Sequence, residues 1–412
     1  MTKARCKTLA IVAGIFLAQT AWAEEGTPLF SLSGFGTLGA VYHDRKGVEF
    51  RRDISVPNGA KDGELSFAQD SMLGVQATAR PDSQFEATLQ LVSRHSIGGD
   101  FQPQATWAYA KYKPAEELSI RAGRLGIELY LQGDSAEIGY ANLSIRQPII
   151  FYPRTHDGLD VEYTRPLGTG TLRLKGSLGV TVGKLMGSSS SDPYDHSGSK
   201  ALGLILEYAR AGWTGRLSAG ELSLKDELSG EQFTTLKSNL SLAPNGAEIL
   251  AGLAMKNRRV NFVSAALAYD SGPLQGTASY SVTSSSNWAD THAFFTHLGY
   301  RLGNCTPYLI YSRQHTARKL AATGIPWGLS AATDALNQGV ALAQANLMIN
   351  QSDVAAGLRY DISRNTALKF QVDRIRYKDP SSIVDPTLSG ESVEYRATRK
   401  LSLISMALEF VF

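Results

Sequence analysis

The segment Val263-Ser-Ala-Ala-Leu-Ala-Tyr-Asp-Ser-Gly-Pro273 alternates its side chains with a period of two and then turns. Side chains two residues apart in an extended chain point the same way, so one face of this segment is apolar along its length. After the tyrosine, Asp-Ser-Gly-Pro supplies residues that favour a tight turn. The segment therefore predicts a β-strand that has one side in an apolar medium and ends at a short turn. The residues of the apolar face are Val263, Ala265, Leu267 and Tyr269.

The same pattern, an alternating strand that ends on a tyrosine before a short polar turn, recurs along the chain. Tyrosine is stable at a membrane interface because its ring is apolar and its hydroxyl binds water. The connections at the other end of these strands are long and irregular, an asymmetry typical of outer-membrane β-barrels. The tyrosines are Tyr112, Tyr163, Tyr208, Tyr269, Tyr300 and Tyr360, and the long connections are residues 44–64, 186–199, 228–260, 319–350 and 380–400.

The alternating segments predict an all-β fold, a transmembrane antiparallel up-and-down β-barrel of about sixteen strands, with fourteen or eighteen as alternatives. A barrel of this size encloses an aqueous lumen. The last segment runs to the chain end at Phe412, and it would pair with the first strand because an unpaired edge in lipid is costly. The predicted strands are residues 29–43, 67–79, 85–95, 104–113, 117–127, 156–165, 171–184, 200–209, 213–225, 261–270, 274–284, 293–301, 306–316, 353–361, 366–378 and 401–412.

Residues 1–23 have the composition of a cleavable export signal, with a basic start, a short apolar run and a small-x-small cleavage site. We therefore expect residues 24–412 to form the mature outer-membrane barrel. Cys6 would leave with the signal, so Cys305 would have no partner for an internal disulfide. The signal features are Lys3, Arg5 and Lys7, the apolar residues 9–17, and Ala21-Trp-Ala23.

Charge and motif content exclude several function classes. The chain has 41 basic and 38 acidic residues, and loss of the three basic signal residues leaves 38 of each. A neutral chain without a basic block gives no reason to expect a nucleic-acid partner. The motifs Gly-x-Ser-x-Gly, His-Glu-x-x-His and Cys-x-x-Cys do not occur. We therefore expect no enzyme, no bound metal and no cofactor.

A set of short motifs lies mainly in the first half of the chain. They are Ser33-Gly-Phe-Gly-Thr-Leu-Gly39, Asp70-Ser-Met-Leu-Gly-Val-Gln76, Leu89-Gln-Leu-Val-Ser-Arg94, Trp107-Ala-Tyr-Ala-Lys-Tyr112, Ser119-Ile-Arg-Ala-Gly-Arg-Leu-Gly126, Ile138-Gly-Tyr-Ala-Asn142 and Asp157-Gly-Leu-Asp-Val-Glu-Tyr163. Together they resemble the Gram-negative porins; beyond residue 163 only the hairpin pattern and the aromatic C-terminus match. The resemblance implies a water-filled channel for passive diffusion of small hydrophilic solutes and ions across the outer membrane, with outer-membrane lipid around the barrel and usually a homotrimeric assembly. The terminal aromatic residue also resembles the signal that the outer-membrane barrel assembly machinery recognises.

The resemblance further implies that the loop after the fifth strand, residues 129–153, folds inward and narrows the pore. This loop contains Asp134, Glu137 and Arg146. A charge facing lipid would cost a few kcal/mol, so charged strand residues must face the lumen or lie beyond the bilayer. The wall facing the loop would include Arg94, Arg121 or Arg124, Asp160 and Glu162, and Arg173 and Lys175. Further lumenal cations are expected at Arg216, Arg313, Arg359, Lys369 and Arg374, a surplus that favours anions.

Three other functions remain as alternatives. A substrate-specific channel could bind small organic anions if the long loops 228–260 and 319–350, the second with a helix-like stretch at 331–348, folded inward. A catalytic barrel would need a nucleophile and base in contact, but the adjacent pairs His95-Ser96 and His196-Ser197 point to opposite faces if they lie in strands. A purely structural or adhesive barrel would conduct no ions.

Overall fold

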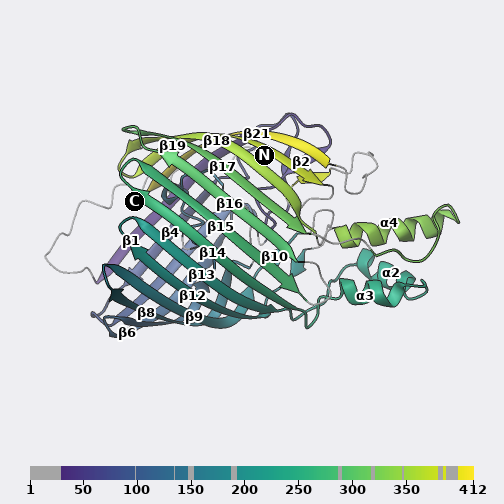
Figure 1. The fold of residues 1–412 in the computed structure, drawn as a ribbon, viewed down its shortest axis with the longest axis horizontal. Coiled ribbons are helices and arrows are strands. Elements are labelled where there is room, and N and C mark those ends of the chain that lie inside the picture. The colour runs from purple at the N-terminus through teal and green to yellow at the C-terminus, as the bar shows by residue number, and fades with distance from the viewer. Residues whose placement is uncertain are drawn as a thin grey trace, which may run out of the picture.

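The computed structural model describes residues 29–97, 99–133, 135–146, 153–186, 193–285, 290–316, 321–345, 348–378, 384–386 and 398–412. Sixteen of its strands form one closed antiparallel barrel in the order β1-β21-β19-β18-β17-β16-β15-β14-β13-β12-β9-β8-β7-β6-β5-β4 (Figure 1). The predicted barrel and its strand count are confirmed. The expected export signal lies outside the described residues.

The barrel strands follow the predicted segments closely. Their bounds are β1 Phe30–Tyr42, β4 Met72–Ala79, β5 Phe85–Arg94, β6 Pro103–Ala115, β7 Leu118–Gly126, β8 Thr155–Leu167, β9 Gly170–Val182, β12 Lys200–Arg210, β13 Trp213–Ser223, β14 Arg259–Ser271, β15 Leu274–Ser285, β16 Thr291–Tyr300, β17 Cys305–Thr316, β18 Asn350–Ser363, β19 Thr366–Lys378 and β21 Thr398–Val411. Short turns join them at one end of the barrel, here called the turn end, and longer connections join them at the other, the loop end.

The chain end closes the barrel. β21 pairs antiparallel with β1, in register from Phe35 opposite Val411 onward. Beyond that pair, the backbone N–H of Gly34 donates to the Phe412 carbonyl over 2.8 Å, and the N–H of Phe412 returns a bond of 2.9 Å. The Phe412 ring lies over Gly34, where a β-carbon would collide with it. The predicted pairing of last and first strand is therefore confirmed, and a glycine makes the close approach possible.

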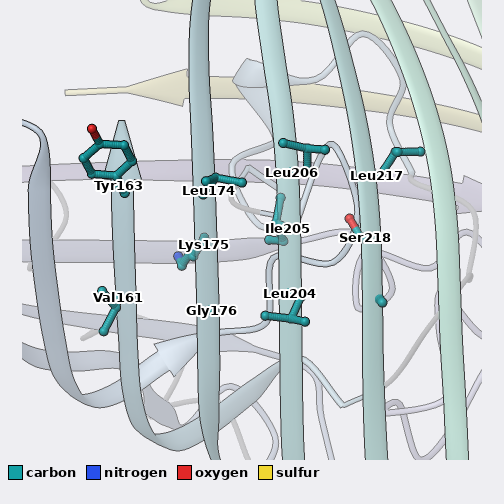
Figure 2. Close-up of a pocket in the computed structure, with 11 residues that line it drawn as sticks. Val161, Tyr163, Leu174, Lys175, Gly176, Leu204, Ile205, Leu206, Leu217 and Ser218 are labelled. Carbon is teal, nitrogen blue, oxygen red and sulfur yellow. The ribbon is translucent and has the colours of Figure 1, made fainter. Parts of the chain in front are cut away.

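The outer face of the barrel carries an apolar band. On β12, Leu202, Leu204 and Leu206 are exposed, and this face continues over β8, β9 and β13 as a shallow apolar groove (Figure 2). The band begins at Tyr208 near the turn end and ends at Lys200, eight residues along the strand. With a rise of about 3.4 Å per residue and a tilt near 40°, eight residues span roughly 20 Å, close to the height of the hydrocarbon layer in such barrels.

Short loop elements cover part of the loop end. β20 (Val384–Pro386), β2 (Val48–Phe50) and β3 (Ala60–Lys61) form a small sheet, and β10 (Lys184–Leu185) pairs with β11 (Tyr194–Asp195). Residues of the small sheet pack on the inner side of β19 and β21 in one apolar cluster. The cluster comprises Val41, Val48, Phe50, Ala60, Ile375, Tyr377, Leu401 and Leu403.

Three helices stand beyond the loop end: α2 (Glu231–Leu240), α3 (Gly246–Leu253) and α4 (Ala331–Ala345) (Figure 1). Buried side chains from all three, among them Leu240 and Val340, form a separate core. The helix-like stretch predicted at residues 331–348 is confirmed as α4. The helices project away from the barrel instead of folding into it. None of the described helices has the length and apolar content needed to cross a membrane.

Candidate pore constriction

The connection between β7 and β8, residues 127–154 and here called the inward loop, runs through the lumen; of these, residues 134 and 147–152 lie outside the described residues. Lys369 on β19 holds it from the wall. Its Nζ donates to the carbonyl oxygens of Gly139, Asn142 and Ser144 over 2.9, 2.6 and 3.2 Å. The same Nζ lies 2.5 Å from Oε2 of Glu409 on β21, and solvent reaches neither side chain. The expected inward path of this loop is confirmed.

Apolar contacts anchor the inward loop at two places on the inner wall. Leu129 packs with Phe262 of β14, and the wall leaves space for it at Gly220 of β13, where a β-carbon would approach the leucine to 2.7 Å. Leu143 packs into a cluster that includes Phe295 of β16. These anchors lie on β13, β14 and β16, so they hold the loop against this part of the inner wall.

Arg146 is the third anchor of the inward loop. Its guanidinium makes two bonds of 2.8 Å to Asp70, lies 3.4 Å from Asp373 and sits over the Phe50 ring. Burial alone would lower the pKa of Arg146, but the carboxylates of Asp70 and Asp373 raise it above its ordinary value. The predicted Arg146 thus lies in the lumen, but its charge is used to fix the loop to the wall.

A second group, here called the loop junction, joins two loops to the barrel wall: Asp53, Arg94, Glu137 and Arg154. Arg94 lies 3.6 Å from Asp53 and 3.6 Å from Glu137. Arg154 lies 3.0 Å from Asp53 and 3.6 Å from Glu137. Burial raises the pKa of Asp53, but Arg154, Arg94 and Arg52 and a hydrogen bond from Ser55 together bring it well below its usual range. The structure therefore brings the predicted Arg94 and Glu137 together; the predicted Asp134 lies outside the described residues.

Opposed charges also line the inner face of β7, β8, β9, β12 and β13, where they form an ion-pair ladder. Glu128 stands at its centre: its carboxylate accepts from Arg121 (2.8 Å), Arg173 (2.7 Å) and Lys175 (2.5 Å). Burial raises the pKa of Glu128, but Lys175 and Arg121 bring it well below its usual range. The ladder comprises Arg121, Glu128, Asp160, Glu162, Arg173, Lys175, Glu207 and Arg216.

The ladder connects the strands to the inward loop. Arg121 binds both carboxylate oxygens of Asp160, and Arg173 binds Glu162 at 2.7 Å. Arg216 lies 2.5 Å from Glu207 and also donates to the carbonyl of Tyr130 over 2.5 Å. The side chains of Arg121 and Arg173 remain 17% exposed, so the ladder forms part of the water-filled surface. The predicted Arg121, Arg173 and Lys175 are thus neighbours.

Other predicted cations divide between the two faces. Of the alternatives Arg121 and Arg124, only Arg121 faces the lumen; Arg124 pairs with Asp157 at 2.7 Å, on the face that also carries Val161 and Tyr163. The predictions that Arg313 and Arg374 face the lumen are wrong. Both lie on the outer face with exposed apolar neighbours. They stand beyond the apolar band towards the loop end, where an outward charge does not contact the hydrocarbon layer. Arg216, Arg359 and Lys369 do face inward.

Sequence reasoning missed the acids that organise the loops: Asp53, Asp70, Glu128 and Asp373. Three of them lie in connections between strands, where no alternation assigns a face. Asp70 stands inside the motif Asp70-Ser-Met-Leu-Gly-Val-Gln76, and this motif was a sequence signal for it. Asp373 lies between outward Val372 and Arg374 and could have been assigned to the lumen by alternation.

The two His–Ser pairs do not form a nucleophile–base contact. His196 Nδ1 lies 3.1 Å from the Thr181 hydroxyl, while the Ser197 hydroxyl bonds to the backbone of Gly183. His95 pairs with Asp100 at 2.6 Å. Each histidine therefore has a partner other than the adjacent serine.

Comparison with known proteins gives a fold and a partial match to one family. The chain shares its fold with the outer membrane channel DcaP of Acinetobacter baumannii (TM-score 0.54, 13% identity, 93% of this chain and 97% of that one). It is likewise similar to OmpF of Salmonella typhi (0.52, 11%, 93% and 97%) and an anion-selective porin from Comamonas acidovorans (0.51, 12%, 93% and 99%). No curated protein sequence matches. The profile that describes Gram-negative porins matches residues 229–380. The profile covers 152 of the 412 residues, and together with the shared barrel fold it supports the resemblance to the Gram-negative porins.

Proposed function

We propose that this protein is a porin of the outer membrane, a general diffusion pore whose neck is set by the inward loop, the loop junction and the ion-pair ladder. One observation carries the proposal: acids on loops face arginines and lysines on the wall, as at Glu128 and Arg173 (2.7 Å). The inward loop narrows the passage, so its width excludes large solutes, and the paired charges that line it create a local field that orients dipolar solutes.

The pairing of the lumenal charges supports a general pore over a substrate-specific one. The ladder has four cations and four carboxylates, and each cation lies within 4 Å of a carboxylate. Specific capture of an organic anion needs cations that are free to bind it, whereas these cations already have partners. We therefore propose weak ion selectivity.

Single-channel recording tests this choice. Purified protein in a planar bilayer should conduct in discrete steps whose size rises linearly with KCl concentration, and micromolar dicarboxylates should leave the current unchanged. A conductance that saturates with salt, or a block at micromolar dicarboxylate, would support the anion-specific channel. A folded barrel without steps would refute both.

We further propose a homotrimer that assembles through the outer face of β4–β8. A row of alanines, Ala79, Ala87, Ala110 and Ala122, crosses β4, β5, β6 and β7 in direct register. This flat row allows a second barrel wall to approach closely. On the same outer face, the Arg124–Asp157 pair would be costly in lipid, where an interface between subunits would shield it.

Native mass spectrometry tests the assembly. Ala110→Trp should break a trimer into monomers because the indole separates the walls. The control Ala265→Trp, on the outer face of β14, should stay trimeric. Trimers of equal stability from both variants would remove β4–β8 from the interface.

A further inference from the structure

Two histidines lie directly opposite each other on the outer face of the barrel at the loop end. His292 of β16 pairs with His315 of β17 in the strand register, and His315 in turn pairs with Asn350 of β18. His292 shares its face with the exposed Phe294, and inward neighbours such as Ala293 are buried. His292, His315 and Asn350, here called the histidine row, thus cross three neighbouring strands (Figure 1).

The spacing of the row suits a shared metal ion. Directly opposite residues of antiparallel strands have their Cβ atoms roughly 5 Å apart. Two imidazoles at this spacing can each place a nitrogen about 2.0–2.1 Å from one ion, the length of a zinc–nitrogen bond. Asn350 adds an oxygen on the next strand: its Oδ1 is buried and has no hydrogen-bond partner among the described residues. A buried amide oxygen without a partner is costly, and a cation would satisfy it.

Tyr280 of β15 prepares His292 for this role. Its hydroxyl lies 2.7 Å from His292 Nδ1, and the two rings stack with their centroids 6.1 Å apart. When Nδ1 donates its hydrogen to the tyrosine oxygen, Nε2 carries the lone pair that a metal binds. Metal-binding histidines have such a partner on the second nitrogen in most sites, because it fixes the tautomer and the orientation of the ring.

The ligands and charges of the row select the kind of ion. Ca²⁺ and Mg²⁺ prefer carboxylates and other oxygens, whereas imidazole nitrogens suit Zn²⁺, Ni²⁺ and Cu²⁺. No third histidine, cysteine or acid forms a metal cluster with the pair in the part of the chain that the structure describes, so water would complete the coordination. The exposed Asp290 and Arg313, each two residues before one histidine, carry opposite charges that offset each other beside the row.

We infer that the histidine row is a site for a divalent transition metal, bound by His292 Nε2, a ring nitrogen of His315 and Asn350 Oδ1. The site lies on the outer wall and is independent of the proposed diffusion function. His315 and Asn350 stand at the two ends of the connection of residues 317–349, which carries α4. A bound ion would therefore tie the base of this connection to β16. No motif marks the pair in the sequence, because the two histidines meet only through the register of two strands.

Isothermal titration calorimetry of the tag-free protein in detergent measures zinc binding. Wild type should bind one Zn²⁺ with micromolar affinity; nickel should compete, and a millimolar excess of calcium should not. His292→Gln and His315→Gln should each weaken binding at least about tenfold, since one of two nitrogen ligands is lost. The matched control His95→Gln removes a histidine that pairs with Asp100 in another loop, and it should bind zinc as wild type does.

Two further variants separate ligation from a structural effect. Asn350→Asp should bind zinc more tightly because a carboxylate replaces the amide oxygen, and Tyr280→Phe should weaken binding roughly tenfold because the partner of Nδ1 is lost. Heat-modifiable gel migration verifies that every barrel is folded. Absence of zinc binding by wild type, equal affinity of wild type and both histidine variants, an equal loss in His95→Gln, or displacement of zinc by calcium would overturn the inference.

Discussion

Lys369 Nζ lies 2.5 Å from Glu409 Oε2 beneath the inward loop, with both side chains closed to solvent. The same ammonium group holds three loop carbonyls, so one buried cation links β19 and β21 to the constriction. A buried charge that serves several partners is costly to remove, because each partner is left without its donor.

Replacement of Lys369 by Met should therefore free the inward loop. We expect a loss of stability on the order of 3 kcal/mol, seen as a lower unfolding temperature in detergent, together with a larger and noisier single-channel conductance. The double variant Lys369→Met and Glu409→Met should recover part of the stability, since it removes both buried charges. Its single-channel conductance should remain larger and noisier than that of wild type, because the loop is still not held. A single variant that melts and conducts like wild type would show that Lys369 does not hold the loop.

Glu128→Gln should shift ion selectivity toward anions. The carboxylate neutralises Arg121, Arg173 and Lys175 at the ladder, and its loss leaves one excess positive charge on the water-filled surface. The reversal potential in a KCl gradient measures the shift. Glu64→Gln, an exposed acid outside the lumenal groups, is the matched control and should leave the potential unchanged. An equal reversal potential for both variants would show that Glu128 does not act on the ions that pass through the pore.

Mild acid should loosen the loop segment around His196. Burial lowers the pKa of His196 to about 4. The neutral ring is thus the form that the fold favours, and its contribution to stability is full above the unfolded pKa near 6.5 and is lost as the pH falls toward 4. Hydrogen exchange should show weaker protection of the Gly198 amide, which donates to the Thr181 carbonyl over 2.9 Å, at pH 4.5 than at pH 7. His196→Gln should abolish this pH dependence; equal protection of wild type at both pH values would contradict the prediction.

Deletion of Phe412 should lower the amount of protein in the outer membrane without changing its synthesis. The residue adds two backbone hydrogen bonds to Gly34 at the closing seam. Immunoblots of outer-membrane and whole-cell fractions measure both quantities. Phe412→Tyr keeps the backbone bonds and an aromatic ring, and it should insert normally. If the deletion variant reached the outer membrane in normal amounts, neither closure of the barrel nor recognition by the assembly machinery would require Phe412.

The strands could be predicted because alternation is a local property that the environment enforces on every segment. The segment from Val263 to Tyr269 predicts a strand without reference to the rest of the chain, and the same alternation recurs in the other barrel strands. The predicted orientation of Arg313 and Arg374 was wrong because both side chains lie beyond the apolar band. A charge at that height can face outward into water, so the rule that charged strand residues face the lumen does not hold there.

The candidate site was less predictable because it is built from long-range pairs. Arg146 and Asp70 are 76 residues apart, and Arg146 and Ser405 are 259 apart. Nothing near Asp53 in the sequence indicates that it meets Arg94 and Arg154, since this contact depends on the path of two irregular loops. The sequence could supply charged candidates such as Glu137, but not their partners.

The central claim is that the inward loop sets the neck of the pore, and a size-exclusion measurement tests it most directly. Liposomes that contain wild-type protein, or a variant in which a short Gly-Ser linker replaces residues 130–146, are swollen in sugars of increasing size. Heat-modifiable gel migration shows in each case that the barrel is folded. The variant should admit sugars that wild type excludes. An identical exclusion limit in two folded barrels would contradict the claim.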